Sequence, residues 1–556
     1  MPSRAEAAAL PPWSTDPADA GGPPPALGDL FAAPALRWPD RPAIADGETG
    51  YAFADLERAA RSVASALAAL GVGEGERVVV LSRKTSAMPV VAVAVWKLAA
   101  VYVPLDGAEP AGRLRALVDR LRPRAVVALD DRDPLTPDAR WLGGADLAAA
   151  LAGDADHPTT PHRPGAAAYV VLAAGPSGVP QGVENSADAL TSYFRAHNRV
   201  LRVTPDSRVL SLSPFQVDVS FEDTLLPLSL GAHVFQFRGL PAGPLVRAVL
   251  ARERITHLIA VSLLLGMITG DGRQLDPARL PALELVMTGA QVCDPAVVAA
   301  WRRRLPGVRL VHAFGPPEAT VFAISHEFGP DDGNGPSGNG PSGNGPSGNG
   351  PSGNGPDEDA GRLIGRPLPG CRVRIVRDGV EQRAPGERGE LWVGGERVML
   401  GYVDQPEETA RAVVEHDGVR YFRTGDVCSR DERGDLRFHG HADPDVGWLA
   451  GRRCHLAEVR RAAEGCPGVG GAVAAVVPRA RRDVVALVVA SADPLVLDAV
   501  AARLDDLLPD HLRPGLLARS PAPVGADALS RLADAARRSD SDRFALSPDG
   551  AVEPIE

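Results

Sequence analysis

The feature that most constrains the fold is an alternation of two kinds of segment between residues 51 and 325. Short apolar runs rich in β-branched residues alternate with alanine-rich stretches typical of helices, such as FADLERAARSVASALAALG. Strands separated by helices form largely parallel sheets, so the sequence predicts an α/β fold. The strand-like runs are RVVVL, AVVAL, AYVVLA, RVLSLS, HVFQF, THLIAV, LELVMTG and RLVHAFG.

Changes in composition divide the rest of the chain. Residues 333–356 repeat GNGPS four times and end in GNGP, so they have no apolar side chain to bury, and we interpret them as a flexible loop insertion. Runs such as GELWVGG and LRFHGH then predict a β-rich subdomain. We expect a disordered leader at 1–26, a large multi-subdomain N-terminal domain at 27–440, a small mobile α+β C-terminal domain at 441–540 and a disordered tail at 541–556.

Charge and cysteine usage narrow the classes of partner. The net charge is -11, which disfavours nucleic acids and anionic membranes because both require an attractive basic surface. Five scattered cysteines without a CxxC pair favour free thiols, and we expect a cytoplasmic protein. The most apolar stretch, Met88 to Leu105, contains Lys97 and two bracketing prolines. It therefore predicts a buried helix followed by a strand, not a membrane span.

A glycine-rich turn follows one of the predicted strands. Residues 173–182 read AAGPSGVPQG, and their glycines are spaced for a backbone cradle around phosphate. Such a turn alone is usually only a tight turn, but six further motifs accompany it in order along the chain. With the strand that leads into the turn, the seven motifs are YAFADL (51–56), WKLAAVYVPLD (96–106), AYVVLAAGPSGVPQG (168–182), VDVS (217–220), HAFGPPEATV (312–321), GERGELWVGGERVMLGY (386–402) and YFRTGDV (421–427).

Taken together, these motifs resemble the core motifs of amino-acid adenylation domains of nonribosomal peptide synthetases. These domains belong to the adenylate-forming superfamily, with acyl-CoA synthetases and luciferases, and the resemblance covers about residues 27–540. It implies that ATP and Mg²⁺ activate an amino acid to aminoacyl-AMP. It also implies that a carrier protein bearing a phosphopantetheine thiol then accepts the aminoacyl group in natural-product biosynthesis.

The resemblance implies a set of nucleotide-binding residues. Asp426 matches the carboxylate that accepts hydrogen bonds from both ribose hydroxyls, and Phe314 matches the aromatic side chain that stacks on adenine. Glu318 matches the glutamate that binds Mg²⁺, an ion that prefers oxygen ligands. The other cofactor-binding positions implied are Gly175, Ser177, Gly178, Gly289, Ala290 and Arg423.

The resemblance also implies a substrate site in VDVS. Asp218 matches the aspartate that pairs with the α-amino group, and a buried carboxylate suits an ammonium ion. This favours an α-amino acid or a close analogue as substrate, bound by Asp218 and Val219. Glu222 falls at a position that often lines the substrate pocket in such domains. There it would meet a basic or polar side chain of the substrate; the alternative is an ordinary surface glutamate. Asp443 matches the hinge about which the C-terminal domain swings.

The phosphate end of the site departs from the family pattern. Only two of the 59 basic residues are lysines, Lys84 and Lys97. Gln181 stands where the phosphate loop has a lysine, and Asp527 stands where the last motif has its catalytic lysine. An acid at the second position reverses the charge that faces the two anionic reactants.

Two functions therefore remain open. The first is a stand-alone amino-acid adenylation enzyme, for which a separate carrier protein is expected because no phosphopantetheine-attachment segment precedes Glu556. The second is a repurposed or catalytically impaired protein that binds AMP, aminoacyl-AMP or a partner without activating anything. A third, an acyl-CoA-synthetase relative acting on a non-amino acid, is disfavoured by Asp218.

Overall fold

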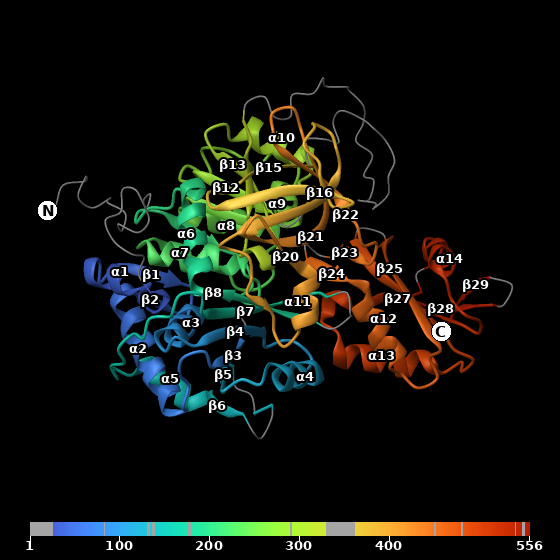
Figure 1. Ribbon diagram of the computed structural model, residues 1–556, viewed down its shortest axis with the longest axis horizontal. Coiled ribbons are helices and arrows are strands. Elements are labelled where there is room, and N and C mark those ends of the chain that lie inside the picture. Colours follow the sequence, from blue (N-terminus) through green and yellow to red (C-terminus); the bar gives the residue numbers. More distant parts are fainter. Residues whose placement is uncertain are drawn as a thin grey trace.

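The computed structural model shows two large sheets in the N-terminal part of the chain and a small sheet in the C-terminal part (Figure 1). The residues it describes are 26–82, 84–130, 134–135, 139–175, 180–289, 292–329, 362–449, 452–479, 482–539, 541–547 and 551–555. The GNGPS segment and residues 1–25 of the predicted leader lie outside these residues. The predicted α/β fold is confirmed.

The first sheet has seven strands in the order β19-β8-β7-β4-β3-β5-β6, and β3 to β7 run parallel where they pair. Val78 and Val80 share a core with α2 and α3, whereas Val79 and Leu81 pack with α4. Helices on both faces explain why RVVVL is apolar throughout. The elements are α1 (Ala32–Arg37), α2 (Phe53–Ala69), β3 (Arg77–Ser82), α3 (Met88–Lys97), β4 (Val101–Asp106), α4 (Ala111–Leu121), β5 (Ala125–Ala128), β6 (Arg140–Gly143), α5 (Gly144–Ala152), β7 (Ala167–Ala173), β8 (Gln181–Ser186) and β19 (Gly401–Tyr402).

The second sheet has 15 strands, in the order β17-β16-β18-β21-β22-β15-β14-β13-β12-β11-β9-β10-β1-β2, with β20 beside β21. Its central strands β9 to β13 are parallel, so their carboxyl ends meet at one edge. Its elements up to β14 are β1 (Pro42–Ala45), β2 (Gly50–Ala52), α6 (Ala187–Leu201), β9 (Arg208–Ser211), the π-helical turn η3 (Phe221–Leu225), α7 (Leu226–Ser229), β10 (His233–Gln236), α8 (Gly243–Arg252), β11 (His257–Val261), α9 (Ser262–Thr269), β12 (Leu285–Gly289), α10 (Pro295–Arg304), β13 (Arg309–Phe314), the 3-10 turn η4 (Pro317–Ala319) and β14 (Ile324–Glu327).

The apolar stretch Met88 to Leu105 forms α3 and then β4, as predicted. Lys97 is fully buried at the end of α3, where its ammonium donates to the Glu57 carboxylate at 2.8 Å. This pairing explains how a charge is accommodated in so apolar a segment. Within the described part of the chain, no helix is both long and apolar enough to cross a bilayer.

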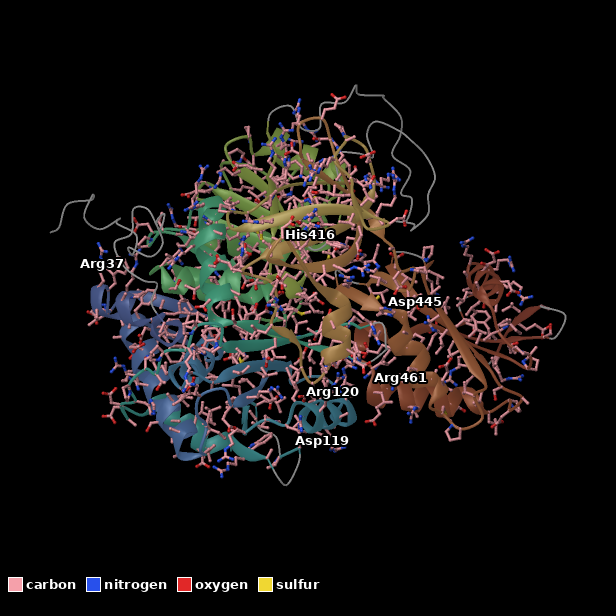
Figure 2. All side chains as sticks on the ribbon, in the orientation of Figure 1. Arg37, Asp119, Arg120, His416, Asp445 and Arg461 are labelled. Carbon is pink, nitrogen blue, oxygen red and sulfur yellow. The ribbon has the colours of Figure 1, made fainter. Side chains whose placement is uncertain are left out.

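The small C-terminal domain packs its helices on a five-stranded sheet, and the hairpin of β23 and β24 precedes it. The prediction of a disordered tail at 541–556 is wrong, since β28 pairs with β27 and the Phe544 ring is fully buried. Figure 2 labels Asp445, which lies between β22 and β23, and Arg461 on α12. The elements are β23 (Val446–Leu449), β24 (Arg452–His455), α12 (Leu456–Glu464), β25 (Gly471–Arg479), β26 (Arg482–Ala490), α13 (Val496–Leu507), η6 (Asp510–Leu512), β27 (Pro514–Ser520), α14 (Ala526–Ala536), β28 (Arg543–Leu546) and β29 (Val552–Pro554).

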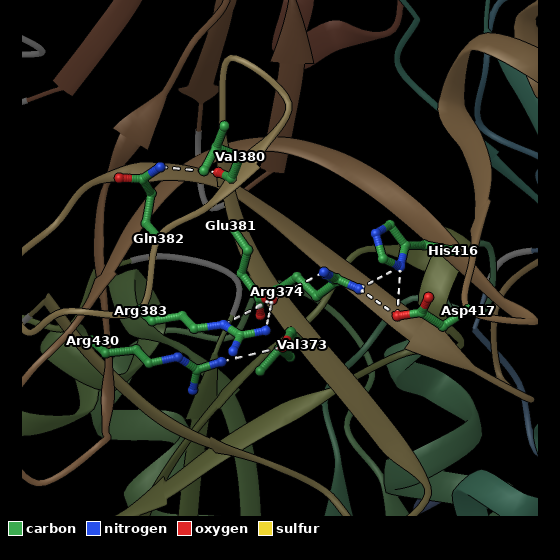
Figure 3. Close-up of polar contacts among 9 residues, drawn as sticks. All are labelled: Val373, Arg374, Val380, Glu381, Gln382, Arg383, His416, Asp417 and Arg430. Carbon is green, nitrogen blue, oxygen red and sulfur yellow. Dashed lines mark hydrogen bonds and ion pairs between the residues drawn. The ribbon is translucent and has the colours of Figure 1, made fainter.

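The β-rich part of the large sheet is held together on one side by an arginine cluster (Figure 3). Arg374 pairs with Glu381 at 3.0 Å and with Asp417 at 3.5 Å, which ties three strand segments together. His416 lies 2.9 Å from the same Asp417 carboxylate. The elements here are β15 (Leu363–Pro367), β16 (Cys371–Arg377), β17 (Val380–Glu381), β18 (Gly389–Gly395), α11 (Pro406–Ala412), β20 (Val413–His416), β21 (Val419–Arg430) and β22 (Leu436–His441).

One buried arginine joins the two domains. Arg113 of α4 donates to the Glu458 carboxylate of α12 at 2.5 Å and to the Leu507 carbonyl of α13 at 3.1 Å. Both charged side chains are mostly buried, at 13% and 7% exposure, so solvent screens the pair little. The contact orients the C-terminal domain so that α12 and α13 lie beside α4 (Figure 1).

Replacing Arg113 should loosen this junction. In Arg113→Ala the Glu458 carboxylate stays buried without its cation, and we expect docking of the C-terminal domain to weaken by about 1–3 kcal/mol. Small-angle scattering should then report a larger radius of gyration. Arg115→Ala is the matched control, because Arg115 lies exposed on the same helix. Equal radii for the two variants would show that Arg113 does not hold the domains together.

Candidate functional site

The glycine-rich turn joins two antiparallel strands of the first sheet, β7 and β8. A Cβ on Gly175 would lie 2.8 Å from the side chain of Gln181, so this close approach requires glycine. Arg120 of α4 donates to the Pro180 carbonyl at 2.8 Å and holds the end of the turn. Two predicted positions, Ser177 and Gly178, lie outside the described residues.

Gln181 occupies the predicted lysine position with a neutral side chain. It is almost fully buried, and its Nε2 donates to Oε1 of Gln405 at 3.1 Å. A cavity of about 650 Å³ runs alongside, with Tyr402 and Gln405 in its wall. The position is thus filled by an amide bound to a second amide, which supplies no charge for a phosphate.

The predicted adenosine-binding residues lie at the carboxyl ends of neighbouring strands. Phe314 ends β13, is half-buried, and its ring centroid lies 5.8 Å from that of Phe438 on β22. Gly289 ends β12, where a Cβ would meet the Ala313 carbonyl at 2.6 Å. Ala290 lies outside the described residues. Because β12 and β13 are parallel neighbours, Gly289 and Phe314 lie at the same edge of the sheet.

Asp426 and Arg423 lie on opposite faces of β21. Asp426 is 7% exposed, and its backbone N–H donates to Oγ1 of the buried Thr424 at 3.0 Å. Arg423 faces outward, where it pairs with Glu390 at 3.0 Å and lies over the Trp392 ring. Side chains alternate across a strand, so Asp426 joins the buried site and Arg423 does not.

The charge of the buried Glu318 acts on two other buried carboxylates, Asp218 and Asp426. Burial and, to a smaller extent, the nearby Glu318 charge raise the pKa of Asp218 to about 7, while three backbone hydrogen bonds oppose the rise. Burial likewise raises the pKa of Asp426 to about 6, with Glu318 adding to the rise and Arg453 opposing it. Oδ2 of Asp218 has no hydrogen-bond partner among the described residues. Among the described residues no ion pair forms with Asp218, whereas Arg453 acts on Asp426, so Asp218 is suited to receive a cation.

The turn that carries Glu318 has an uncommon backbone conformation. Thr320 and Val321 adopt positive φ angles of 60° and 65°, a region that β-branched residues rarely enter. The Tyr402 hydroxyl donates to Oε1 of Glu318 at 2.9 Å and holds the carboxylate in place. Such strain persists where the surrounding structure imposes it, which is common at functional sites.

Glu222 and Val219 lie next to Asp218. Val219 is half-buried against the main core. Glu222 is fully buried in the π-helical turn η3, so the surface alternative for this residue is wrong. Its Oε2 accepts from the Tyr193 hydroxyl and lies 3.1 Å from Nδ1 of His197. Glu222 is therefore a buried polar group beside the predicted substrate aspartate.

The C-terminal domain presents the β23–β24 hairpin, and not α14, to this site. Asp527 lies in the first turn of α14, where it is exposed and pairs with Arg531 at 3.0 Å. Among the contacts described, α14 packs only within its own domain. Arg453 of β24 is half-buried, and its charge lowers the pKa of Asp426 and of His441. In this arrangement Asp527 is not brought together with the carboxylates.

Asp443 links the end of the N-terminal domain to that hairpin. Its backbone N–H donates to Nδ1 of His441 at 3.0 Å, and its carboxylate lies 3.1 Å from Nε2 of His455 on β24. These two contacts hold the segment that joins β22 to β23 against His441 on one side and against β24 on the other. Asp443 thus occupies a position from which a backbone rotation would move the whole C-terminal domain.

Glu318 fits the ligand role that the sequence assigned to it. Within the described ranges, no three His, Cys, Asp or Glu side chains gather in a way that could hold a metal ion by themselves. Mg²⁺ commonly takes one or two protein carboxylates and completes its shell with phosphate oxygens and water. The held carboxylate of Glu318 would suit such an ion.

Comparison with known proteins decides the family. The family described as AMP-binding enzyme matches residues 31–403, which is most of the chain. The chain belongs to this family. It is an adenylate-forming domain of the type found in nonribosomal peptide synthetases, as the seven ordered motifs predicted.

Two relatives of the chain are much longer proteins. Phenyloxazoline synthase MbtB of Mycolicibacterium paratuberculosis is 31% identical over 497 residues, which cover 88% of this chain and 40% of MbtB. Nonribosomal peptide synthetase ivoA of Emericella nidulans is 29% identical, over 79% of this chain and 24% of ivoA. The chain therefore spans less than half of either relative. PA1221, a solved nonribosomal peptide synthetase protein with adenylation and PCP domains, superposes with a TM-score of 0.75 at 21% identity, over 91% of this chain and 82% of that one.

Several residues of the candidate site were not predicted from the sequence. Tyr402 lies inside a quoted motif but contacts Glu318 only because β19 pairs with β8. Tyr193 and His197 are four residues apart on α6, a spacing that places both on one helix face. That spacing was the only signal for them in the sequence. No sequence pattern pointed to Arg453, since its position depends on how the two domains pack.

The raised pKa of Asp218 makes a prediction about stability. The folded-state pKa is about 7 and the ordinary value 3.8, so the cost of burying the charge grows from pH 4 to pH 7 and is constant above it. In the ligand-free protein, Asp218→Asn should raise the free energy of unfolding by roughly 2–4 kcal/mol at pH 8 and by much less at pH 5.

Thermal unfolding at the two pH values measures this difference. Asp527→Asn is the control, because the Asp527 carboxylate is exposed and its removal should shift the melting temperature little at either pH. If Asp218→Asn lowered the melting temperature at pH 8, the carboxylate would have a partner that stabilises its charged form.

Proposed function

We propose that the protein activates an α-amino acid by AMP-forming adenylation and passes it to a carrier-protein phosphopantetheine thiol. The observation that carries this proposal is Asp218, a buried carboxylate with one free oxygen and a pKa near 7, facing Glu318. An ammonium group at Asp218 would supply the missing cation. The adenylation and PCP domains of PA1221 support a carrier protein as acceptor.

The other residues suit the parts of ATP and of the reaction. Asp426 suits the two ribose hydroxyls because a carboxylate accepts both bonds, and the half-buried ring of Phe314 suits adenine. A Mg²⁺ ion bound at Glu318 would neutralise charge on the phosphates. Val219 and Glu222 would line the substrate side-chain pocket, and Asp443 would be the hinge for domain movement. Gly175 and Gly289 would allow the backbone to approach the nucleotide.

A second function is favoured by the phosphate end of the site. Gln181 is neutral and bonded to Gln405, and Asp527 is exposed on α14. The cation whose charge acts on Asp426 in this arrangement is Arg453 of β24. A protein with this charge distribution could hold AMP or an aminoacyl-AMP without forming it.

Pyrophosphate exchange distinguishes the two functions. With ATP and Mg²⁺, an adenylating enzyme should show exchange that depends on one or a few amino acids, and Asp218→Ala should reduce it by at least 100-fold because the ammonium loses its buried partner. Asp506→Ala is the control at an exposed acid of α13. Silence across an amino-acid panel, together with measurable AMP binding, would support the second function.

Placing lysines at positions 181 and 527 tests whether missing positive charge near the phosphates limits the reaction. Loss of one positioned phosphate donor typically costs about 3 kcal/mol of transition-state stabilisation, so Gln181→Lys and Asp527→Lys together should raise the exchange rate by 10-fold or more. Gln181→Met, which removes the bond to Gln405 without adding charge, is the control. An unchanged rate in the double variant would mean that these positions do not carry the missing charge.

A further inference from the structure

The turn that carries Glu318 is held by groups from the other large sheet. Glu318 lies in η4, between β13 and β14 of the second sheet. Tyr402 belongs to β19 of the first sheet, where it pairs with Val183 of β8, and its hydroxyl donates to Oε1 of Glu318 at 2.9 Å. Because these elements belong to different sheets, the position of the carboxylate depends on how the two sheets meet.

Asn185 of β8 makes a second link to the turn. Its side chain is fully buried, and its Nδ2 donates to the carbonyl of Pro317, the residue before Glu318, at 3.2 Å. Oδ1 of the same amide accepts from the Thr320 hydroxyl at 3.3 Å. One buried amide therefore bonds to the chain on both sides of Glu318, and it does so where the backbone enters the region of positive φ at Thr320.

The segment that leads into β19 fixes the backbone of the turn. The N–H of Met399 donates to the Glu318 carbonyl at 2.8 Å, and the Thr320 hydroxyl lies 2.8 Å from the carbonyl of Arg397. These bonds hold a strained backbone that would otherwise relax. The segment thus holds the main chain of the turn, and Tyr402 at its end holds the Glu318 side chain.

The Tyr402 hydroxyl can act only as a donor to Glu318. Burial, followed by the Glu318 charge and hydrogen bond, raises the pKa of Tyr402, so the phenol keeps its proton at neutral pH. That proton occupies Oε1 of Glu318, and among the described residues no hydrogen bond forms to Oε2. A carboxylate with one oxygen bonded and the other open suits Mg²⁺, which commonly takes one or two protein carboxylates.

We propose that Tyr402 and Asn185 are positioning residues, which hold Glu318 with Oε2 open for Mg²⁺. The inference rests on the proposed function, which takes Glu318 as the ligand of this ion. Both residues act through Glu318, so neither is a catalytic residue. A ligand that is already held in place loses little conformational entropy when the ion binds, so these bonds should raise the affinity for Mg²⁺.

Nucleotide binding with and without Mg²⁺ tests this and does not depend on catalysis. The probe is α,β-methylene-ATP, which cannot be cleaved between its α- and β-phosphates, titrated into the full chain by calorimetry. We expect Mg²⁺ to tighten its binding to the unmodified chain. Tyr402→Phe should reduce this tightening about 10-fold, because a group that orients a metal ligand commonly contributes that much to metal affinity. Metal-free binding should stay unchanged in Tyr402→Phe.

A double-mutant cycle assigns the effect to Glu318. Glu318→Gln should remove most of the tightening by Mg²⁺, and Tyr402→Phe should then have little further effect in that background. Asn185→Ala should act in the same direction as Tyr402→Phe. Tyr102→Phe is the matched control, because the Tyr102 hydroxyl is buried and has no hydrogen-bond partner among the described residues.

Three results would overturn the role of Tyr402. Tyr402→Phe would keep the full Mg²⁺ effect, or it would weaken metal-free and Mg²⁺-dependent binding equally, as a general disturbance of the fold does, or the unmodified chain would show no Mg²⁺ effect. A full Mg²⁺ effect in Asn185→Ala would remove Asn185 from the assignment. Should Asn185→Ala fail to fold, the cycle of Tyr402 and Glu318 still decides the matter.

The same data separate this inference from the proposed function. If pyrophosphate exchange is absent while the Mg²⁺ effect is present and depends on Tyr402, the positioning role stands and adenylation is refuted. If exchange is present while Tyr402→Phe keeps the full Mg²⁺ effect, adenylation stands and the positioning role is refuted.

Discussion

Burial of carboxylates without matching cations is the constraint on which the site depends. Asp218, Glu222, Glu318 and Asp426 are each less than one-tenth exposed, and burial raises the pKa of both aspartates. A protein keeps such an arrangement only where a ligand supplies the missing charge or the surroundings impose the cost. Here Asp218 has a free oxygen and Glu318 is held by Tyr402. The fold thus stores free energy that the binding of an ammonium ion would release.

The two ends of the site differ in how completely they are built. At the adenosine end, parallel strands bring Gly289 and Phe314 together, and Asp426 is buried beside them. At the phosphate end, the Gln181 amide is neutral and the β23–β24 hairpin occupies the junction. The buried pair of Arg113 and Glu458 favours this domain arrangement, in which Asp527 stays exposed. Under the proposed function, activity would depend on which charges the C-terminal domain brings to the phosphates.

Much of the fold and part of the site could be predicted from the sequence. Every strand-like run between residues 51 and 325 forms a strand, because β-branched residues suit sheets buried on both faces. The tail was mispredicted, since its short strands become stable only by pairing with β27. The assignment of Arg423 rested on its place in RTGD, and alternation along β21 turns it outward. The groups around Glu222 could not be predicted, since they come from separate elements.

The sequence by itself determined the family, the order of the motifs and the types of residue at the nucleotide and substrate positions. These are local properties: a motif needs only its own residues in order, and a strand or helix follows from periodicity over a few positions. Only the tertiary structure decided that Glu222 is buried against Tyr193 and His197, that Arg397 lacks an ion-pair partner among the described residues, and that Arg453 and not Asp527 approaches Asp426. The reason is that burial and charge pairing depend on side chains far apart in the chain, whose distances are set when the sheets and domains pack.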